Sequence, residues 1–249
     1  MPTITDTITT SDGTCPVTLA TPGGSVSSGP WPGVVMYPDA AGRRPVIEEM
    51  AQKLAGYGYA VLVPDIFYRA GDWAPFDINT AFGDPEERTR LMSMMGSITP
   101  EIMASDAAAF FDYLESRPEV SGTAFGTTGY CMGGRTSLVV AGRVPERVAA
   151  AMSFHGGGLA SDDPGSPHLL ADQIRAAVYV AGAENDKSFT TEQAETLDKA
   201  LTAAGVEHTI EFYPAAHGFA VSDHAGIYDP DAAERHWKAM ESFFGAKLG

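Results

Sequence analysis

The chain has 249 residues and a formal net charge of −16, with 16 lysines and arginines against 32 aspartates and glutamates. Phosphate groups of nucleic acids require a basic surface, so this charge argues against a nucleic-acid partner. No stretch reaches the roughly 18 consecutive apolar residues that span a membrane, and the polar start lacks the basic and apolar regions of a signal peptide.

The order of apolar runs predicts an α/β fold in one domain over residues 1–249. Two strand-like runs flank the turn Ser11-Asp12-Gly13 and predict an antiparallel hairpin. Further apolar runs then alternate with helical patterns, as in a mostly parallel sheet with helices on both faces. The expected strands, about eight in one sheet, are residues 3–10, 14–20, 33–37, 60–64, 123–130, 148–154, 176–181 and 208–213.

Several expected helices have recognisable starts. Residues 45–57 repeat apolar side chains at helical spacing, and Thr190 begins a capping-box pattern. Asp229 and Pro230 supply an N-cap and a proline at the first helical position for the last helix. Residues 68–97 have no clean period and are rich in Gly, Asp, Met and aromatic residues. We expect this segment to be either a lid over a site or an irregular surface excursion.

Residues 129–133, Gly-Tyr-Cys-Met-Gly, place a thiol between an expected strand and helix-compatible residues 135–142. A Gly-x-nucleophile-x-Gly turn holds its central residue in a strained backbone conformation, and the glycines leave room for the turn to pack. The motif therefore predicts that Cys131 is a nucleophile. The alternative is that Cys131 is one more small buried residue at a glycine-rich turn. With Cys15 as the other cysteine and nothing to suggest an oxidising compartment, we expect a reduced, cytoplasmic protein.

A thiol nucleophile needs a base, and the base needs an acid that orients it. With this type of turn the order along the chain is nucleophile, acid and histidine, each after a later strand. Asp186 and His217 follow the last two expected strands, so both would meet Cys131 at the carboxyl edge of the sheet. Glu184 is the alternative acid, and His155 is expected to support a loop rather than act as the base. The remaining histidines lack a matching context: His168, His208, His224 and His236.

These residues predict acyl transfer to sulfur. His217, oriented by Asp186, would hold Cys131 as a thiolate that attacks an acyl carbon and forms a thioester. The backbone N–H groups of Met132 and Ala40 would stabilise the oxyanion. Because a thiolate is a good leaving group, we expect activated esters, enol esters and strained lactones to be preferred over amides.

Over nearly its whole length the chain resembles the dienelactone hydrolase family of the α/β-hydrolase superfamily. The resemblance lies in residues 129–134, in the loop at Asp186 and in His217-Gly218-Phe219, with further support from residues 59–65 and 84–90. It implies an α/β-hydrolase fold without a separate cap domain, a triad of Cys131, His217 and Asp186, and no metal or cofactor. It also implies small-molecule substrates, namely cyclic enol-lactones such as the dienelactone formed during breakdown of aromatic compounds.

Two positions depart from the family pattern. A glutamate that contacts the resting thiol in the family corresponds here to the shorter Asp39, and of two arginines that hold the substrate carboxylate only Arg90 is matched, because Val221 stands at the second position. We therefore expect a less anionic or larger ester or lactone. Tyr130 and Phe219 are candidate substrate contacts, with core packing as the alternative. A broad carboxylesterase or thioesterase, or a non-catalytic thiol-bearing binding protein, are the alternative functions.

Overall fold

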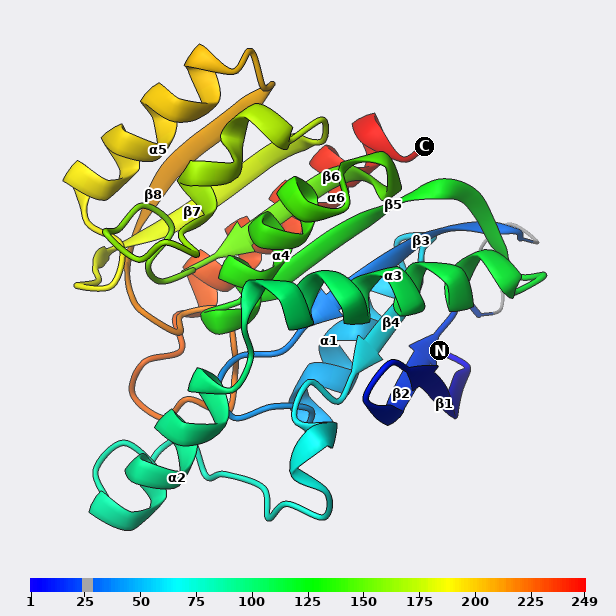
Figure 1. The fold of residues 1–249 in the computed structure, drawn as a ribbon, viewed down its shortest axis with the longest axis horizontal. Coiled ribbons are helices and arrows are strands. Elements are labelled where there is room, and N and C mark those ends of the chain that lie inside the picture. The colour runs from blue at the N-terminus through cyan, green and yellow to red at the C-terminus, as the bar shows by residue number, and fades with distance from the viewer. Residues whose placement is uncertain (24–28) are drawn as a thin grey trace.

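The computed structural model describes residues 1–23 and 29–249. These residues form one eight-stranded sheet in the order β1-β2-β4-β3-β5-β6-β7-β8 (Figure 1). β1 pairs antiparallel with β2, β2 pairs antiparallel with β4, and the other neighbours are parallel, which confirms the predicted α/β fold with its N-terminal hairpin. The strands are β1 (Thr3–Thr10), β2 (Gly13–Ala20), β3 (Trp31–Tyr37), β4 (Ala60–Pro64), β5 (Val120–Tyr130), β6 (Val148–Phe154), β7 (Ala177–Asn185) and β8 (His208–Ala216).

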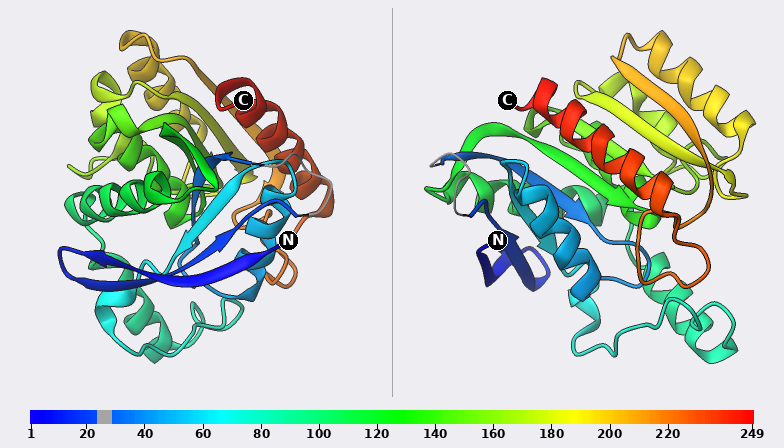
Figure 2. Two further views of the ribbon diagram at one scale, coloured as in Figure 1. Left: turned by 90° about the vertical axis from the view of Figure 1, so that its right-hand side faces the viewer. Right: turned by 180° about the vertical axis from the view of Figure 1, so that it is seen from behind.

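Helices cover both faces of the sheet. On one face α3, α4 and α5 pack over a core that includes Val35, and on the other face α1 and α6 pack over a core that includes the adjacent Val34 and Met36. Figure 2 shows α1 and α6 in front when the molecule is seen from behind. The helices are α1 (Pro45–Ala55), α2 (Pro85–Gly96), α3 (Pro100–Ser116), α4 (Met132–Arg143), α5 (Thr191–Ala203) and α6 (Pro230–Lys247), with short 3-10 turns η1 (Tyr68–Ala70), η2 (Pro145–Arg147) and η3 (Pro167–Gln173).

The predicted helix starts are confirmed by their caps. The Thr190 hydroxyl accepts a hydrogen bond from a backbone N–H of the first turn of α5 at 3.4 Å, and the Asp229 carboxylate does the same for α6 at 2.9 Å. β7 continues beyond the predicted 176–181, because backbone pairing with β8 extends through small and polar residues that carry no hydrophobic signal. In the described part of the chain, no helix combines the length and apolarity needed to cross a membrane.

The segment 68–97 contains η1 and α2 and lies beside the carboxyl ends of the strands (Figure 1). α2 has one buried residue, Leu91, which packs in a small cluster with Ala40, Phe76 and Ala81. The single apolar anchor explains why the sequence shows no helical period there. Through this cluster α2 is attached to the loop that follows β3.

Candidate active site

Cys131 lies between β5 and α4 with φ 53° and ψ −115°, a conformation that residues with a side chain rarely adopt. A Cβ placed on Gly129 would lie 2.2 Å from the carbonyl oxygen of Gly133. One on Gly133 would lie 2.3 Å from the carbonyl oxygen of Tyr37. Both glycines are therefore required by backbone contacts, and the second of them packs the turn against the end of β3.

The structure brings Asp186, after β7, and His217, after β8, to this turn. Nδ1 of His217 donates a hydrogen bond to Oδ2 of Asp186 at 2.6 Å, and His217 and Cys131 line the same cavity. The other oxygen of Asp186 accepts bonds from the backbone N–H and the hydroxyl of Ser188, at 2.7 and 2.6 Å. Glu184, the alternative acid, is exposed, so Asp186 is the carboxylate that orients the histidine.

The surroundings favour the charged forms of both His217 and Asp186. Burial lowers the pKa of His217, but its interactions with Asp186 and Cys131 outweigh burial and raise that pKa to about 10. Burial raises the pKa of Asp186, yet the bonds from His217 and Ser188 bring it below its ordinary value. The surroundings of His217 therefore favour its imidazolium form.

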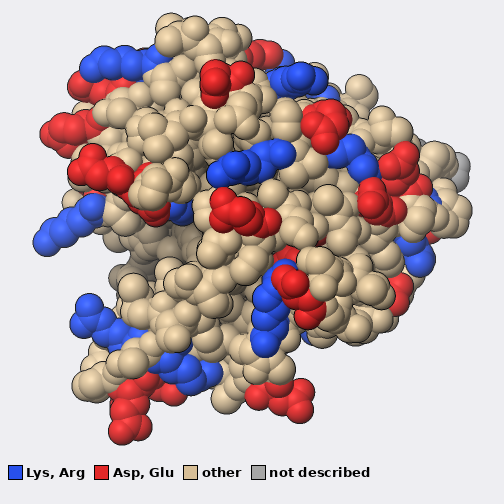
Figure 3. Space-filling view, in the orientation of Figure 1, with Lys and Arg blue, Asp and Glu red and all other residues tan. Residues whose placement is uncertain are grey.

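A cavity of about 490 Å³ adjoins these groups. Its lining combines the sulfur, acid and base with an apolar wall that comes largely from the α2 region. Figure 3 shows a hollow on this face of the molecule, between the part that carries α5 and the part that carries α2. The lining residues are Phe82, Met92, Met95, Cys131, Met132, Arg135, Gly157, Asp186, Lys187, Ser188 and His217.

The expected oxyanion donors lie on two adjoining segments. Met132 is the first residue of α4, where a helical N–H has no partner within the helix, and Ala40 belongs to the loop after β3. The contact of Gly133 with the end of β3 brings these segments together. Within residues 1–23 and 29–249, neither the Ala40 N–H nor the Met132 N–H donates a hydrogen bond to a backbone carbonyl in a turn, loop or helix cap. Both are available to a ligand.

Asp39 is buried beside Arg44 rather than bonded to the sulfur. Its two oxygens accept hydrogen bonds from the Arg44 guanidinium at 2.7 and 2.9 Å, and Arg44 binds Asp223 at 2.6 and 2.9 Å. Burial raises the pKa of Asp39, but the contacts with His224 and Arg44 hold it well below its ordinary range. Among the described residues, Asp39 makes no hydrogen bond with Cys131.

Three expected substrate contacts do not line the cavity. Arg90 is paired with Glu87 at 2.7 and 3.1 Å on α2. Tyr130 is fully buried beneath α6, with its hydroxyl 3.1 Å from Nε2 of His236, because neighbouring residues of a strand point to opposite faces. Phe219 is fully buried in the same core, so for both aromatic residues the packing alternative describes the structure.

Other residues line the cavity without having been expected there. Arg135 lies one helical turn after Cys131, and this spacing of four on a helix is the signal that could have identified it. It donates to the carbonyl of Gly158 and to Asp163, both at 2.7 Å. Ser188 stands two residues after Asp186, as in an Asx turn. Met92 and Met95 had no readable signal, because their position depends on where α2 packs.

His155 is fully buried, with its ring 5.3 Å from that of His217. Neither of its ring nitrogens has a hydrogen-bond partner in the described part of the chain, and burial takes its pKa well below the ordinary value. A neutral ring in this position supports the side of His217, in agreement with the expectation that His155 is not the base.

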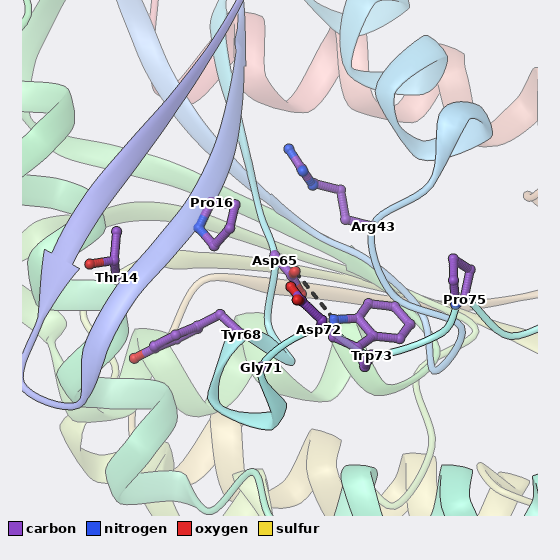
Figure 4. A pocket seen from close by; sticks show the side chains of 9 residues that line it. All are labelled: Thr14, Pro16, Arg43, Asp65, Tyr68, Gly71, Asp72, Trp73 and Pro75. Carbon is purple, nitrogen blue, oxygen red and sulfur yellow. Dashed lines mark hydrogen bonds between the residues drawn. The ribbon is translucent and has the colours of Figure 1, made fainter.

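A separate cavity of about 410 Å³ lies between β2 and the segment that follows β4 (Figure 4). The Trp73 indole N–H donates to Asp65 there at 3.3 Å. Its lining includes none of Cys131, His217 and Asp186, so it is not the candidate site. Over the described ranges, no three His, Cys, Asp or Glu side chains are arranged to hold a metal ion.

Comparison with known proteins identifies the family. The model of the dienelactone hydrolase family matches residues 16–248. The chain belongs to the dienelactone hydrolase family. A Synechocystis protein named "Putative carboxymethylenebutenolidase" is 29% identical over 228 residues, which cover 90% of this chain and 89% of that protein. A protein of the same name from Escherichia coli K12 is 26% identical over 225 residues, covering 88% of this chain and 78% of that protein.

Among solved structures, a dienelactone hydrolase-like promiscuous phosphotriesterase from metagenomic libraries is similar, with a TM-score of 0.80, 27% identity and full coverage of both chains. The resemblance noted from the residues around Cys131, Asp186 and His217 is therefore confirmed at the level of family and fold. Membership makes the protein a hydrolase of esters or lactones.

Proposed function

We propose that this dienelactone hydrolase family member cleaves a lactone or carboxylic ester through Cys131 as nucleophile and a thioester acyl-enzyme. The observation that carries the proposal is the position of the His217 ring, which is hydrogen-bonded to Asp186 at 2.6 Å and lines the same cavity as Cys131. This is the arrangement that an activated nucleophile requires.

In the first half-reaction the Cys131 thiolate attacks the acyl carbon, a C–S bond forms, and the carbonyl electron pair moves onto oxygen. The N–H groups of Ala40 and Met132 hold the resulting oxyanion, and loss of one such donor typically costs about 10²–10³ in rate. When the oxyanion collapses the C–O bond breaks, and the alkoxide or enolate takes its proton from the His217 imidazolium. The alcohol leaves, and the acyl group remains on sulfur.

In the second half-reaction the now neutral His217 removes a proton from water as the water oxygen attacks the thioester carbon. Collapse of this intermediate breaks the C–S bond and releases the carboxylic acid. The sulfur leaves as thiolate beside a protonated His217, so the starting ion pair is restored. Asp186 keeps the ring oriented and stabilises its charge in both steps.

The cavity supports a less anionic substrate than dienelactone. Its wall includes the apolar side chains of Phe82, Met92 and Met95. Arg90 is held by Glu87 outside the lining, and the second family arginine is replaced by the buried Val221. An apolar ester, as hydrolysed by a broad carboxylesterase, is therefore favoured over a lactone that carries a carboxylate.

The test is a panel of p-nitrophenyl esters and an enol-lactone assayed with the wild type, Cys131→Ala and the matched control Cys15→Ala. Cys15 is a fully buried free thiol on β2 and does not line the cavity. We expect Cys131→Ala to fall to the background rate while Cys15→Ala keeps its turnover, and mass spectrometry of the quenched wild type to find one acyl group on Cys131. Full turnover by Cys131→Ala on every hydrolysed substrate would overturn the assignment.

A further inference from the structure

A second cavity of about 390 Å³ adjoins the catalytic cavity. The two share four lining residues, namely Met92 and Met95 of α2 with Met132 and Arg135 of α4. The two cavities are therefore neighbours that meet at the same side chains of α2 and α4.

The lining of this second cavity suits an apolar occupant. Besides the three shared methionines it includes Ile98, Pro100 and Met103, and unbranched thioether side chains adapt to irregular apolar ligands. The polar groups there already have protein partners: Thr99 caps α3, and Asp163 is paired with Arg135 at 2.7 Å. A polar ligand would find few free partners, whereas an alkyl chain needs none.

The mouth of the two cavities also exposes apolar surface. The side chains of Phe82 and Met92, which both line the catalytic cavity, are 49% and 51% exposed. Exposed large apolar groups that border a cavity are typical of binding surfaces, because a ligand removes them from water.

The position of His217 indicates which part of the substrate lies in the second cavity. The leaving alcohol must be next to His217, which gives it a proton, and the catalytic cavity is lined by His217, Asp186 and Ser188. None of these three lines the second cavity. The part of the substrate that extends past Met132 is therefore the acyl group, which stays on the sulfur.

We propose that the second cavity is a subsite for the distal part of an apolar acyl chain, so that the enzyme prefers esters of medium-chain acids. The inference rests on the proposed function and specifies its substrate class. The test compares kcat/KM for p-nitrophenyl acetate, butanoate, hexanoate and octanoate. Acetate esters of alcohols of increasing length form the second series.

Each methylene that enters an apolar site is expected to raise kcat/KM by up to about fourfold. We expect octanoate to exceed butanoate by at least roughly tenfold, with a much smaller gain along the alcohol series. A flat or falling acyl profile overturns the proposal, as does a larger gain along the alcohol series. A flat profile in an enzyme whose turnover still requires Cys131 rejects the subsite alone, whereas turnover without Cys131 rejects the proposed function.

Gly96→Trp tests the location. Gly96 lines the second cavity, and a Cβ there meets no heavy atom within 4 Å, so the position accepts a larger side chain at the edge of this cavity. Gly245 of α6 has the same open surroundings away from both cavities, which makes Gly245→Trp the matched control.

We expect Gly96→Trp to lower the octanoate-to-butanoate ratio of kcat/KM by at least roughly tenfold, while Gly245→Trp keeps the wild-type ratio. Circular dichroism checks that both variants fold. If Gly96→Trp does not fold, Gly96→Leu is used as a smaller substitution at the same position. An unchanged ratio in a folded Gly96 variant places the acyl chain elsewhere and overturns the proposal.

Discussion

Replacing Arg44 with alanine tests how the loop after β3 is joined to the segment that follows the histidine. The guanidinium binds Asp39 at 2.7 and 2.9 Å and Asp223 at 2.6 and 2.9 Å. Asp39 precedes Ala40, the expected oxyanion donor, and Asp223 lies six residues after His217. One side chain therefore holds together the two loops on which the proposed chemistry depends.

The cost of the substitution follows from burial. The side chain of Arg44 is 9% exposed and that of Asp39 is 1% exposed, so Arg44→Ala removes the guanidinium that neutralises a buried carboxylate and leaves His224, 3.5 Å away, beside it. Removing one partner of a buried pair typically costs about 3–5 kcal/mol of unfolding free energy. For a domain of this size that corresponds to a Tm lower by roughly 6–20 °C. Displacement of the Ala40 N–H would lower kcat/KM by up to about 10²–10³.

Thermal unfolding followed by circular dichroism and kcat/KM for p-nitrophenyl butanoate measure the two effects. The matched control is Arg43→Ala, because this neighbouring arginine is more exposed and lies 3.6 Å from Glu48. This partly exposed ion pair contributes at most about 1 kcal/mol, and Arg43 also donates a hydrogen bond to the Thr18 hydroxyl at 2.9 Å. If Arg44→Ala melts within about 2 °C of Arg43→Ala and keeps its kcat/KM, Arg44 does not hold the loops in the way described.

Three further predictions concern single positions. With its pKa raised to about 10, the His217 imidazolium stabilises the fold fully below its ordinary pKa of 6.5 and loses that contribution as the pH rises through 10. Activity should decline over the same alkaline range. In Asp186→Asn the decline should occur at lower pH, because the carboxylate that raises the pKa of His217 is gone. An unshifted pH–rate profile would contradict this role of Asp186. Gly129→Ala should lower the Tm, because the new Cβ would lie 2.2 Å from a backbone oxygen. In Gly245→Ala the new Cβ meets no atom within 4 Å, so the free energy of unfolding should rise by up to about 1 kcal/mol. Equal melting curves for the two variants would refute this. Arg90→Ala should change kcat/KM for a carboxylate-bearing ester by less than about threefold, and a loss above about tenfold would restore Arg90 as a substrate contact.

The features that the sequence predicted well are local in origin. The N-cap Asp229 and the hairpin turn at residues 11–13 act through hydrogen bonds and backbone preferences within a few residues, so the sequence alone reveals them. The turn at Cys131 is partly of the same kind: Gly129 is required by the backbone of Gly133 within the motif, whereas Gly133 is required by the distant end of β3. The approach of Asp186 to His217 was predictable because parallel strands end at one edge of the sheet.

What the sequence by itself determined was thus the order of elements, the edge where the reactive groups meet and the residue types that can react there. Only the tertiary structure decided how side chains are paired and which of them face the cavity. Arg44 joins Asp39 to a residue 179 positions away from itself, and α2 brings Met92 and Met95 to the wall of the cavity. These outcomes depend on packing between segments that are distant along the chain, and neither periodicity nor motif spacing carries information about such contacts.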